Sequence, residues 1–440
     1  MKTSETSIFI KNCSNKNIFR TFAAESEIKE FKKLEKLMKL MELKKLKTIF
    51  ILALIVMSAQ AQKKELGQAR TYIKSGKDYD KAEKLMTDLI AKDSASRYNK
   101  KVYATWYESV LGQYQQVNEK IYLHQKYDTT TVYTLLNRLY RVAETLDTLD
   151  AKPDEKGRVK PEYRKSNADQ LDKLRRNLYF GGTYNVRRNK YKEAYNYFET
   201  YIDAARQPLF AAYDYAKNDA YMPTAAYWAT LSGYRMKDAE RTLRYSQMAL
   251  TDTTKAVYVR QYICEAYSWQ NNEEAYLKAL EDGFAHHPAY PYFFPRLGDY
   301  YNKHGQIDKT LQLSNEGLAK YPDRPLFLLA KSVALLELDR YDECIDTSNR
   351  LIAKDPDVPE SYFNIATCYL NQALELEKKN EPRLYRSRLT DLYTKARQPM
   401  EQYRKLAPKD QKRWAPALYR IYLNLNLGQQ FEEIDRLMKQ

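Results

Sequence analysis

Cysteine and histidine side chains supply most metal ligands and many nucleophiles, and this chain of 440 residues contains only four of each. The cysteines are Cys13, Cys264, Cys344 and Cys368. No two of them have the C-x-x-C spacing of a zinc site or a redox centre. The adjacent His286 and His287 stand at a predicted helix end and project in different directions, with no third ligand beside them. The sequence therefore predicts no metal site and no cofactor.

Motifs that carry enzyme chemistry are also missing from the sequence. It contains no G-x-S-x-G, no H-E-x-x-H, and neither of the glycine-rich phosphate loops G-x-x-x-x-G-K-[ST] and G-x-G-x-x-G. Gly181 and Gly182 follow no predicted strand, so we interpret them as small residues at a close helix contact. We predict a protein with no catalytic residues. An enzyme site in the irregular residues that follow the export signal stays an open alternative.

The charge balance is basic, with 73 Lys and Arg against 57 Asp and Glu. Residues 1–61 hold 12 basic and 6 acidic residues, so 61 basic and 51 acidic residues remain and the net charge of the rest is +10. The charges are dispersed, and no pattern of a nucleic-acid-binding module is present, so we predict no nucleic-acid partner. Such a surface suits attraction to anionic polymers of the cell envelope.

Residues 41–61 have the three parts of a secretory signal peptide. Lysines precede the apolar run 48–57, and small residues around Ala61 offer a cleavage point. The run is about half the length that a bilayer-spanning helix needs. No cysteine that could carry a lipid stands near the cleavage point. We therefore expect a periplasmic or secreted protein whose mature chain has no transmembrane segment.

Residues 1–40 precede this signal, although export signals normally begin a chain. Met41 and Met38 are both plausible true starts, so we interpret 1–40 as an N-terminal extension from a misassigned initiation codon. The alternative is an amphipathic helix over residues 27–39 that lies on a membrane surface.

An internal repeat of 34 residues dominates the rest of the chain. Pro288, Pro322 and Pro356 follow this spacing. The same spacing relates small residues at Cys264, Gly298, Ser332 and Ala366, and large residues at Tyr267, Tyr301, Leu335 and Tyr369. Several columns in one register predict stacked copies of one structural unit. We expect the small column to let the two antiparallel helices of each unit approach closely.

The repeat resembles the tetratricopeptide repeat, whose pattern is W-x2-L-G-x2-Y, then A-x3-F, then P. Phe294-x2-Leu297-Gly298-x2-Tyr301 matches the first part with Phe for Trp, and Ala194-x3-Phe198 matches the second. The resemblance implies an all-α solenoid of antiparallel helix pairs. In layout, a signal followed by a long helical chain, the sequence also looks similar to exported repeat proteins of Gram-negative bacteria, especially Bacteroidota.

We predict nine helix pairs, with irregular spacing at both ends of the array. The predicted organisation is an irregular helical region 62–150, a charged linker 151–166, and the repeat array 167–440 with insertions near 207–220 and 377–388. The linker is broken by two prolines and a glycine. Within residues 62–150, Asp128 is positioned to cap the helix that begins after it.

The resemblance implies that a concave groove is lined by the first helix of each pair. On that basis the partner-binding residues are Tyr227, Tyr234, Arg235, Tyr258, Gln261, Glu265, Trp269, Tyr292, Asp299, Asn302, Lys303, Phe363 and Asn371, with Leu326, Leu329, Val333, Glu337 and Thr367 at equivalent positions. These residues lack the Lys and Asn arrangement with which some such proteins clamp a terminal carboxylate. A protein or peptide partner in the envelope is the predicted ligand.

The 40 tyrosines leave a second function open. Tyrosine can simply fill packing positions while its hydroxyl reaches a polar group, and this is the interpretation we favour. Aromatic side chains on a basic surface also suit a glycan- or peptidoglycan-binding module, which we keep as the alternative. For the cysteines, burial as small apolar residues is expected, and a disulfide between Cys344 and Cys368 is the open alternative.

Overall fold

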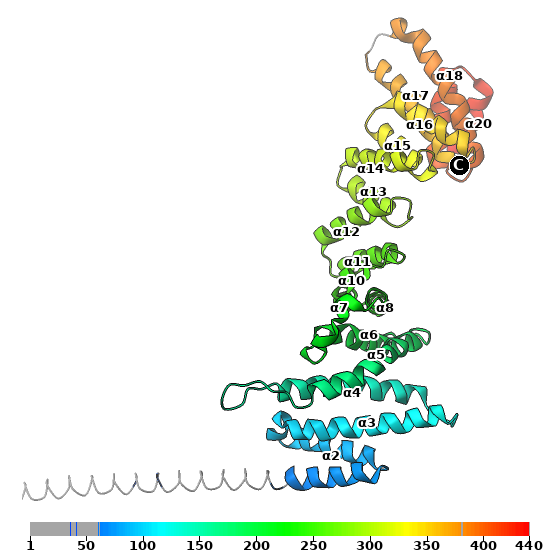
Figure 1. Cartoon of the computed structure of the whole chain (residues 1–440). Helices are drawn as coiled ribbons and strands as arrows, with labels where there is room; N and C mark the ends of the chain where they lie inside the picture. The colour runs from blue at the N-terminus through cyan, green and yellow to red at the C-terminus, as the bar shows by residue number, and fades with distance from the viewer. Residues whose placement is uncertain (1–35, 37–40, 42–59, 61, 380–381, 440) are drawn as a thin grey trace, which may run out of the picture. The chain divides into compact units, whose positions relative to one another are not determined.

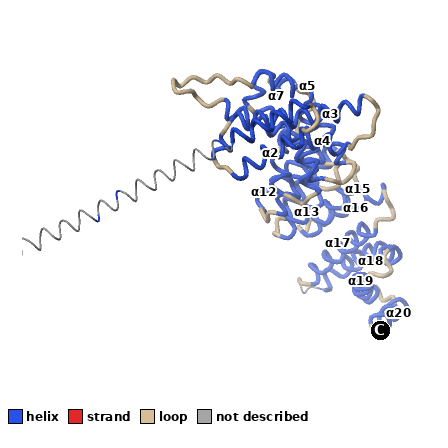
Figure 2. Tube along the Cα trace, turned by 90° about the horizontal axis from the view of Figure 1, so that it is seen from below, coloured by secondary structure: helices blue, strands red, loops and turns tan. Residues whose placement is uncertain are grey.

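The computed structural model describes residues 62–379 and 382–439, together with the single positions 36, 41 and 60. The predicted extension 1–40 and signal peptide 41–61 lie outside these residues, apart from the single positions. Within the described residues every regular element is a helix and no strand is present (Figure 2). The prediction of an all-α fold is confirmed. No helix in this part of the chain is long and apolar enough to span a bilayer.

The chain forms two compact units, which are described separately. Unit 1 extends to Leu178 and also takes in Arg206–Tyr213. Unit 2 consists of Tyr179–Ala205 and the chain from Asp214 onwards. Helix α5 (Arg164–Val186) contributes residues to both units.

Unit 1 consists of long helices joined by short turns. These are a helix at residues 62–75, α2 (Tyr79–Lys92), α3 (Lys100–Tyr122), α4 (Thr129–Asp150) and the first part of α5, with short turns of 3-10 helix at Ala95–Tyr98 and Pro208–Tyr213. The start of α4 follows the prediction, because the carboxylate of Asp128 accepts the backbone N–H groups of Thr130 and Thr131.

One buried carboxylate connects three helices of unit 1. Glu83 of α2 accepts hydrogen bonds from the Trp106 indole at 3.1 Å and from the Gln113 amide at 2.7 Å, both on α3. It also pairs with Arg138 of α4 at 2.8 Å. We call these four residues the Glu83 cluster. They satisfy a carboxylate that would be costly to bury alone.

The predicted linker 151–166 runs from α4 into the start of α5, inside unit 1. Two acidic residues at the end of α4, Asp147 and Asp150, form hydrogen bonds with the residues that end this loop. The guanidinium of Arg164 contacts both carboxylate oxygens of Asp147, at 2.7 and 2.9 Å. The backbone N–H of Tyr163 donates to Asp150 at 2.8 Å. These bonds fix where the loop leaves α4 and where α5 begins.

Unit 2 continues as helix pairs that follow one another in chain order (Figure 1). Its helices are α6 (Tyr191–Asp203), α7 (Tyr215–Asn218), α8 (Met222–Arg235), α9 (Ala239–Arg244), α10 (Ser246–Ala249), α11 (Ala256–Trp269), α12 (Glu273–His286), α13 (Phe293–Lys303), α14 (Ile307–Lys320), α15 (Pro325–Glu337), α16 (Tyr341–Lys354), α17 (Pro359–Glu377), α18 (Pro382–Leu406), α19 (Gln411–Asn424) and α20 (Gly428–Met438), with a 3-10 turn at Ala204–Arg206. Helices α17 and α18, which flank the insertion predicted near 377–388, have 19 and 25 residues against 14 in α16.

Prolines set the ends of the regular helices. Helices α12, α14 and α16 each end two residues before Pro288, Pro322 or Pro356. Proline ends a helix because it lacks the N–H of the next hydrogen bond. Pro325 and Pro359 stand at the first positions of α15 and α17, where that N–H is not needed.

A close contact between neighbouring repeats joins a glycine to a phenylalanine. A Cβ on Gly283 would lie 2.3 Å from the ring of Phe293, and a Cβ on Gly317 would lie 2.8 Å from the ring of Phe327. The second glycine and the second phenylalanine each follow the first by 34 residues, so the contact repeats. At Gly298 the nearest atom to an added Cβ is 3.9 Å away. That atom belongs to Thr310 of α14, so Gly298 faces the second helix of its own pair at an ordinary van der Waals distance and is less crowded than Gly283 and Gly317.

Tyrosine hydroxyls bond to carboxylates throughout unit 2. The donors and acceptors are Tyr201 and Asp219 (2.6 Å), Tyr292 and Glu265 (2.7 Å), Tyr301 and Glu281 (2.6 Å), Tyr341 and Asp339 (2.7 Å), Tyr393 and Glu377 (2.5 Å), Tyr422 and Glu401 (3.0 Å), and Tyr403 and Asp410. In each pair the apolar tyrosine ring is buried, while its hydroxyl group forms a hydrogen bond with the carboxylate. Structural pairing therefore accounts for a substantial part of the tyrosine excess.

Candidate functional site

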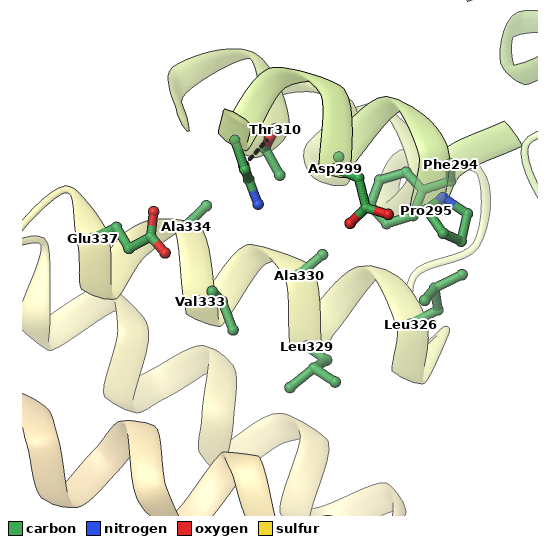
Figure 3. A pocket seen from close by; sticks show the side chains of 12 residues that line it. Phe294, Pro295, Asp299, Thr310, Leu326, Leu329, Ala330, Val333, Ala334 and Glu337 are labelled. Carbon is green, nitrogen blue, oxygen red and sulfur yellow. Dashed lines mark hydrogen bonds between the residues drawn. The ribbon is translucent and has the colours of Figure 1, made fainter. Parts of the chain in front are cut away.

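An open apolar groove lies between the first helices of two successive repeats. It has a volume of about 190 Å³ and lies between α13 and α15 (Figure 3). We call it the α13–α15 groove; it is lined by Phe294, Pro295, Gly298, Asp299, Asn302, Thr310, Leu326, Leu329, Ala330, Val333, Ala334 and Glu337. The helices are held beside each other by the rings of Phe294 and Phe327, whose centroids are 4.8 Å apart.

The groove combines an apolar surface with two carboxylates. Pro295 from α13 and Leu326 from α15 belong to the apolar part. Asp299 points from α13 toward α15, and Ala330 points from α15 toward α13 (Figure 3). Asp299 and Glu337 are exposed, and neither forms a hydrogen bond or ion pair with another described residue. Both carboxylates are therefore able to accept bonds from a ligand.

An amide donor stands beside these acceptors. The side-chain oxygen of Asn302 accepts a hydrogen bond from the Thr310 hydroxyl at 2.7 Å (Figure 3). Because the oxygen is occupied, the exposed NH2 group of Asn302 is the end that a ligand would meet. The groove thus offers apolar contact, two anionic acceptors and one neutral donor, which suits binding and provides no nucleophile.

Several residues that the sequence placed on the groove come together here. Asp299 and Asn302 line the cavity, and so do Leu326, Leu329, Val333 and Glu337 from the equivalent positions of the next repeat. Phe294, Gly298, Ala330 and Ala334 line it as well, although the sequence assigned the first two to packing and did not single out the others. A spacing of four from Leu326 would have indicated Ala330 and then Ala334 on one helix face.

A second group of predicted residues lies in α8, α11 and the turn before α13. Tyr234 stacks on Tyr262 and on Trp269, with centroids 4.2 and 5.7 Å apart. The Gln261 side chain accepts a hydrogen bond from Tyr290 at 2.7 Å. Tyr258 meets the ring of Tyr290 edge-on at 6.2 Å. These side chains mainly form their ring contacts and hydrogen bonds with one another.

Two tyrosines in this second group are buried. Tyr227 is 8% exposed, and Tyr292 is 7% exposed with its hydroxyl on Glu265. Burial, and then the bond to Glu265, raises the pKa of Tyr292. The Arg296 guanidinium covers the Tyr292 ring at 3.7 Å from its centroid. Little of either ring is left to a partner.

The remaining predicted residues are not brought to the α13–α15 groove. Arg235 and Lys303 are exposed and do not line it, and the Arg235 guanidinium lies 6.0 Å from the centre of a tyrosine ring. Phe363 is covered by Arg413, whose guanidinium is 3.8 Å from the ring centroid. Asn371 is half-buried on α17, away from the cavity. The sequence could place these residues on first helices but could not show which neighbours cover them.

The chemistry-bearing residues have structural surroundings. In the described part of the chain no group of three or more His, Cys, Asp or Glu side chains is arranged to hold a metal ion. Cys344 and Cys368 are buried free thiols, and Cys344 donates to the Ser332 carbonyl at 3.1 Å. A Cβ on Gly182 would lie 2.5 Å from Phe198, which confirms the predicted close helix contact.

Helix pairs that repeat every 34 residues, with prolines after the second helix, have the arrangement of the tetratricopeptide repeat fold. No family model matches the chain, and no curated protein matches it. Similar solved structures include PilW, a widely conserved type IV pilus biogenesis factor (13% identity, 49% of this chain and 92% of that chain covered, TM-score 0.32). Others are the C-terminal part of a TPR repeat-containing protein from Cytophaga hutchinsonii (10%, 58% and 94%, TM-score 0.35) and yeast Tom70 (13%, 87% and 91%, TM-score 0.30). These values are low, so the fold assignment rests on the helix pairs of this chain.

Proposed function

We propose that this protein is a non-catalytic protein–protein interaction scaffold of the cell envelope. In this proposal a protein or peptide segment binds in the α13–α15 groove. The observation that carries the proposal is the meeting of an apolar surface and two unpaired carboxylates in one cavity, built by equivalent helices of successive repeats. The repeated helices supply a rigid surface, and the groove provides contacts that require no chemistry of bond breaking.

The groove favours one kind of segment. An apolar side chain would enter between Leu326 and Pro295, which are both partly exposed, so burial releases water from both surfaces. A Lys or Arg on either side of it would reach Asp299 or Glu337. The expected partner segment is therefore an extended stretch with an apolar residue flanked by positive charge. This is the opposite charge pattern from a segment recognised through its own carboxylate.

The location in the envelope is supported by the signal at residues 41–61 and by the basic composition of the remaining chain. N-terminal sequencing of the protein from fractionated cells tests it. We expect the first residue to be Gln62 and the protein to be in the periplasmic or secreted fraction. An uncleaved chain in the cytosolic fraction would contradict this part of the proposal.

Selection from a random peptide library on residues 62–440, followed by fluorescence anisotropy, tests the groove. We expect apolar peptides that carry Lys or Arg. Filling the groove with Ala330→Trp should abolish their binding. Removing both charges with Asp299→Asn and Glu337→Gln should weaken it about tenfold, which corresponds to about 1.4 kcal/mol.

The matched control is Glu316→Gln, which removes an exposed carboxylate on α14 outside the groove. It should leave the affinity unchanged. If the selected peptides lack positive charge, or if their binding survives Ala330→Trp, the α13–α15 groove is not the binding site.

A further inference from the structure

A second, larger cavity lies on another part of unit 2, between α16, α17 and α18. Its volume is about 600 Å³, within the range of roughly 300–1,000 Å³ that is usual for small-molecule sites. It is lined by Asn349, Ile352, Tyr362, Ile365, Tyr369, Thr394, Lys395, Gln398, Pro399 and Gln402. We call it the α17–α18 pocket. It shares no residue with the α13–α15 groove.

One wall of the pocket is aromatic. Tyr362 and Tyr369 are seven residues apart on α17, so they share a helix face, and Ile365 stands between them. Both tyrosines are half-buried. The Tyr362 hydroxyl donates to the Pro356 carbonyl at 3.0 Å, which fixes the ring by its polar end. The wall therefore offers flat apolar surface held in place.

The facing wall is rich in neutral hydrogen-bonding groups. Gln398 and Gln402 are four residues apart on α18, and Asn349 comes from α16. None of these three carboxamides forms a hydrogen bond with another described residue. Each presents one acceptor oxygen and two N–H donors. In the same wall Pro399 has no N–H, so the carbonyl of Lys395, four residues earlier, loses its usual partner within the helix.

The pocket carries almost no net charge. Among the described residues that line the pocket, Lys395 is the only ionisable side chain apart from the two tyrosines, and its ammonium group pairs with Asp391 at 2.7 Å. The pocket thus differs from the α13–α15 groove, which has two unpaired carboxylates. A ligand that fits it is uncharged, has a ring with an apolar face, and has many donors and acceptors around its edge.

We propose that the α17–α18 pocket binds an uncharged saccharide. The C–H face of a pyranose ring would lie against Tyr362 or Tyr369. A carboxamide can donate to one hydroxyl group and accept from its neighbour, so Gln398, Gln402 and Asn349 match the paired hydroxyls of a sugar. A peptide would gain less here, because the pocket offers neither an unpaired charged partner for its side chains nor a strand edge for its backbone.

Titration of the mature chain with maltotriose, cellotriose and tri-N-acetylchitotriose, followed by saturation-transfer NMR, tests this proposal. We expect saturable binding of at least one trisaccharide. The double substitution Gln398→Leu and Gln402→Leu keeps the side-chain size and removes both carboxamides, so it should weaken binding at least tenfold. Tyr369→Leu should also weaken binding because it removes an aromatic ring from the pocket.

Two controls separate the sites and the causes. Gln429→Leu removes an exposed carboxamide on α20 outside the pocket and should not change binding. Ala330→Trp, which fills the α13–α15 groove, should not change it either, so this proposal and the peptide-binding proposal fail independently. The saccharide proposal is overturned if no trisaccharide binds saturably, or if binding survives the double substitution in a protein with unchanged helical circular dichroism.

Discussion

Residues 256–354 of unit 2 and residues 79–150 of unit 1 are both built from paired helices, but different contacts hold them together. In the first region the same apolar contact, a phenylalanine ring against a glycine, recurs in successive repeats. In the second, the single Glu83 cluster connects three helices. Regular repeats therefore distribute their stability, whereas the irregular unit concentrates part of it in one polar network.

The largest effect is expected for Phe327→Ala. Phe327 is fully buried, and its loss removes the ring that lies on Gly317. We expect a loss of roughly 3–5 kcal/mol of unfolding free energy, as for other buried phenylalanines. Hydrogen exchange should show faster opening in the neighbouring repeats and no change in residues 79–150. Equal acceleration in both regions would contradict the idea that repeats distribute their stability locally.

Removal of the acceptor in unit 1 with Glu83→Ala should have the next largest effect. The change leaves Trp106, Gln113 and Arg138 without their common partner, and bonds to charged groups contribute about 1.5–3 kcal/mol. We expect a loss of about 2–3 kcal/mol in urea unfolding, with accelerated exchange in α2, α3 and α4 together. Glu83→Gln keeps an acceptor and should lose less. If only α2 responds, the cluster does not couple the helices.

A pair of glycine substitutions tests which column carries the close contact. Gly317→Ala places a Cβ 2.8 Å from the Phe327 ring, so we expect a loss of about 1–3 kcal/mol from overpacking. Gly298→Ala has 3.9 Å of space and replaces a helical glycine, so it should stabilise the fold by about 0.5–1 kcal/mol. Thermal denaturation of both variants gives the comparison. The same sign for both would refute the assignment.

The smallest effect concerns the tyrosine–carboxylate pairs. Burial, and then the bond to Glu377, raises the pKa of Tyr393 from 10.0 to about 12. The folded state thus favours the neutral hydroxyl of Tyr393. The contribution of this hydroxyl to the unfolding free energy is complete below pH 10 and is lost as the pH rises toward 12. We expect Tyr393→Phe to cost at most about 1 kcal/mol at pH 8 and to reduce the loss of stability above pH 10. Urea midpoints at pH 8 to 11 check this, and an unchanged pH dependence would contradict it.

The sequence predicts the regular repeats well because one spacing constrains many residues at once. Pro288, Pro322 and Pro356 place the ends of three helices, and Asp128 places the start of another. The small column was less informative. Small size at Gly298 coincides with a cavity and not with a tight contact, and residue type alone does not separate these two causes.

The candidate site was predictable only in part for a related reason. Resemblance places Asp299 and Glu337 on equivalent faces of first helices, and both line the α13–α15 groove. It does not show that Arg413 covers Phe363, or that Tyr290 reaches from a turn to Gln261. Such contacts depend on long-range side-chain packing, for which a repeat spacing gives no constraint. The Glu83 cluster was missed because its members follow no periodic pattern.

The two unpaired carboxylates of the α13–α15 groove have a consequence for the rate of binding. They stand on a chain whose residues after position 61 carry a net charge of +10. At a distance a cationic segment is repelled by the molecule as a whole, and only within about 8 Å at physiological salt do the local carboxylates dominate. Added salt should therefore quicken encounters while it shortens the lifetime of the complex. Two opposing salt dependences, one for arrival and one for departure, are the kinetic signature of an acidic groove on a basic protein.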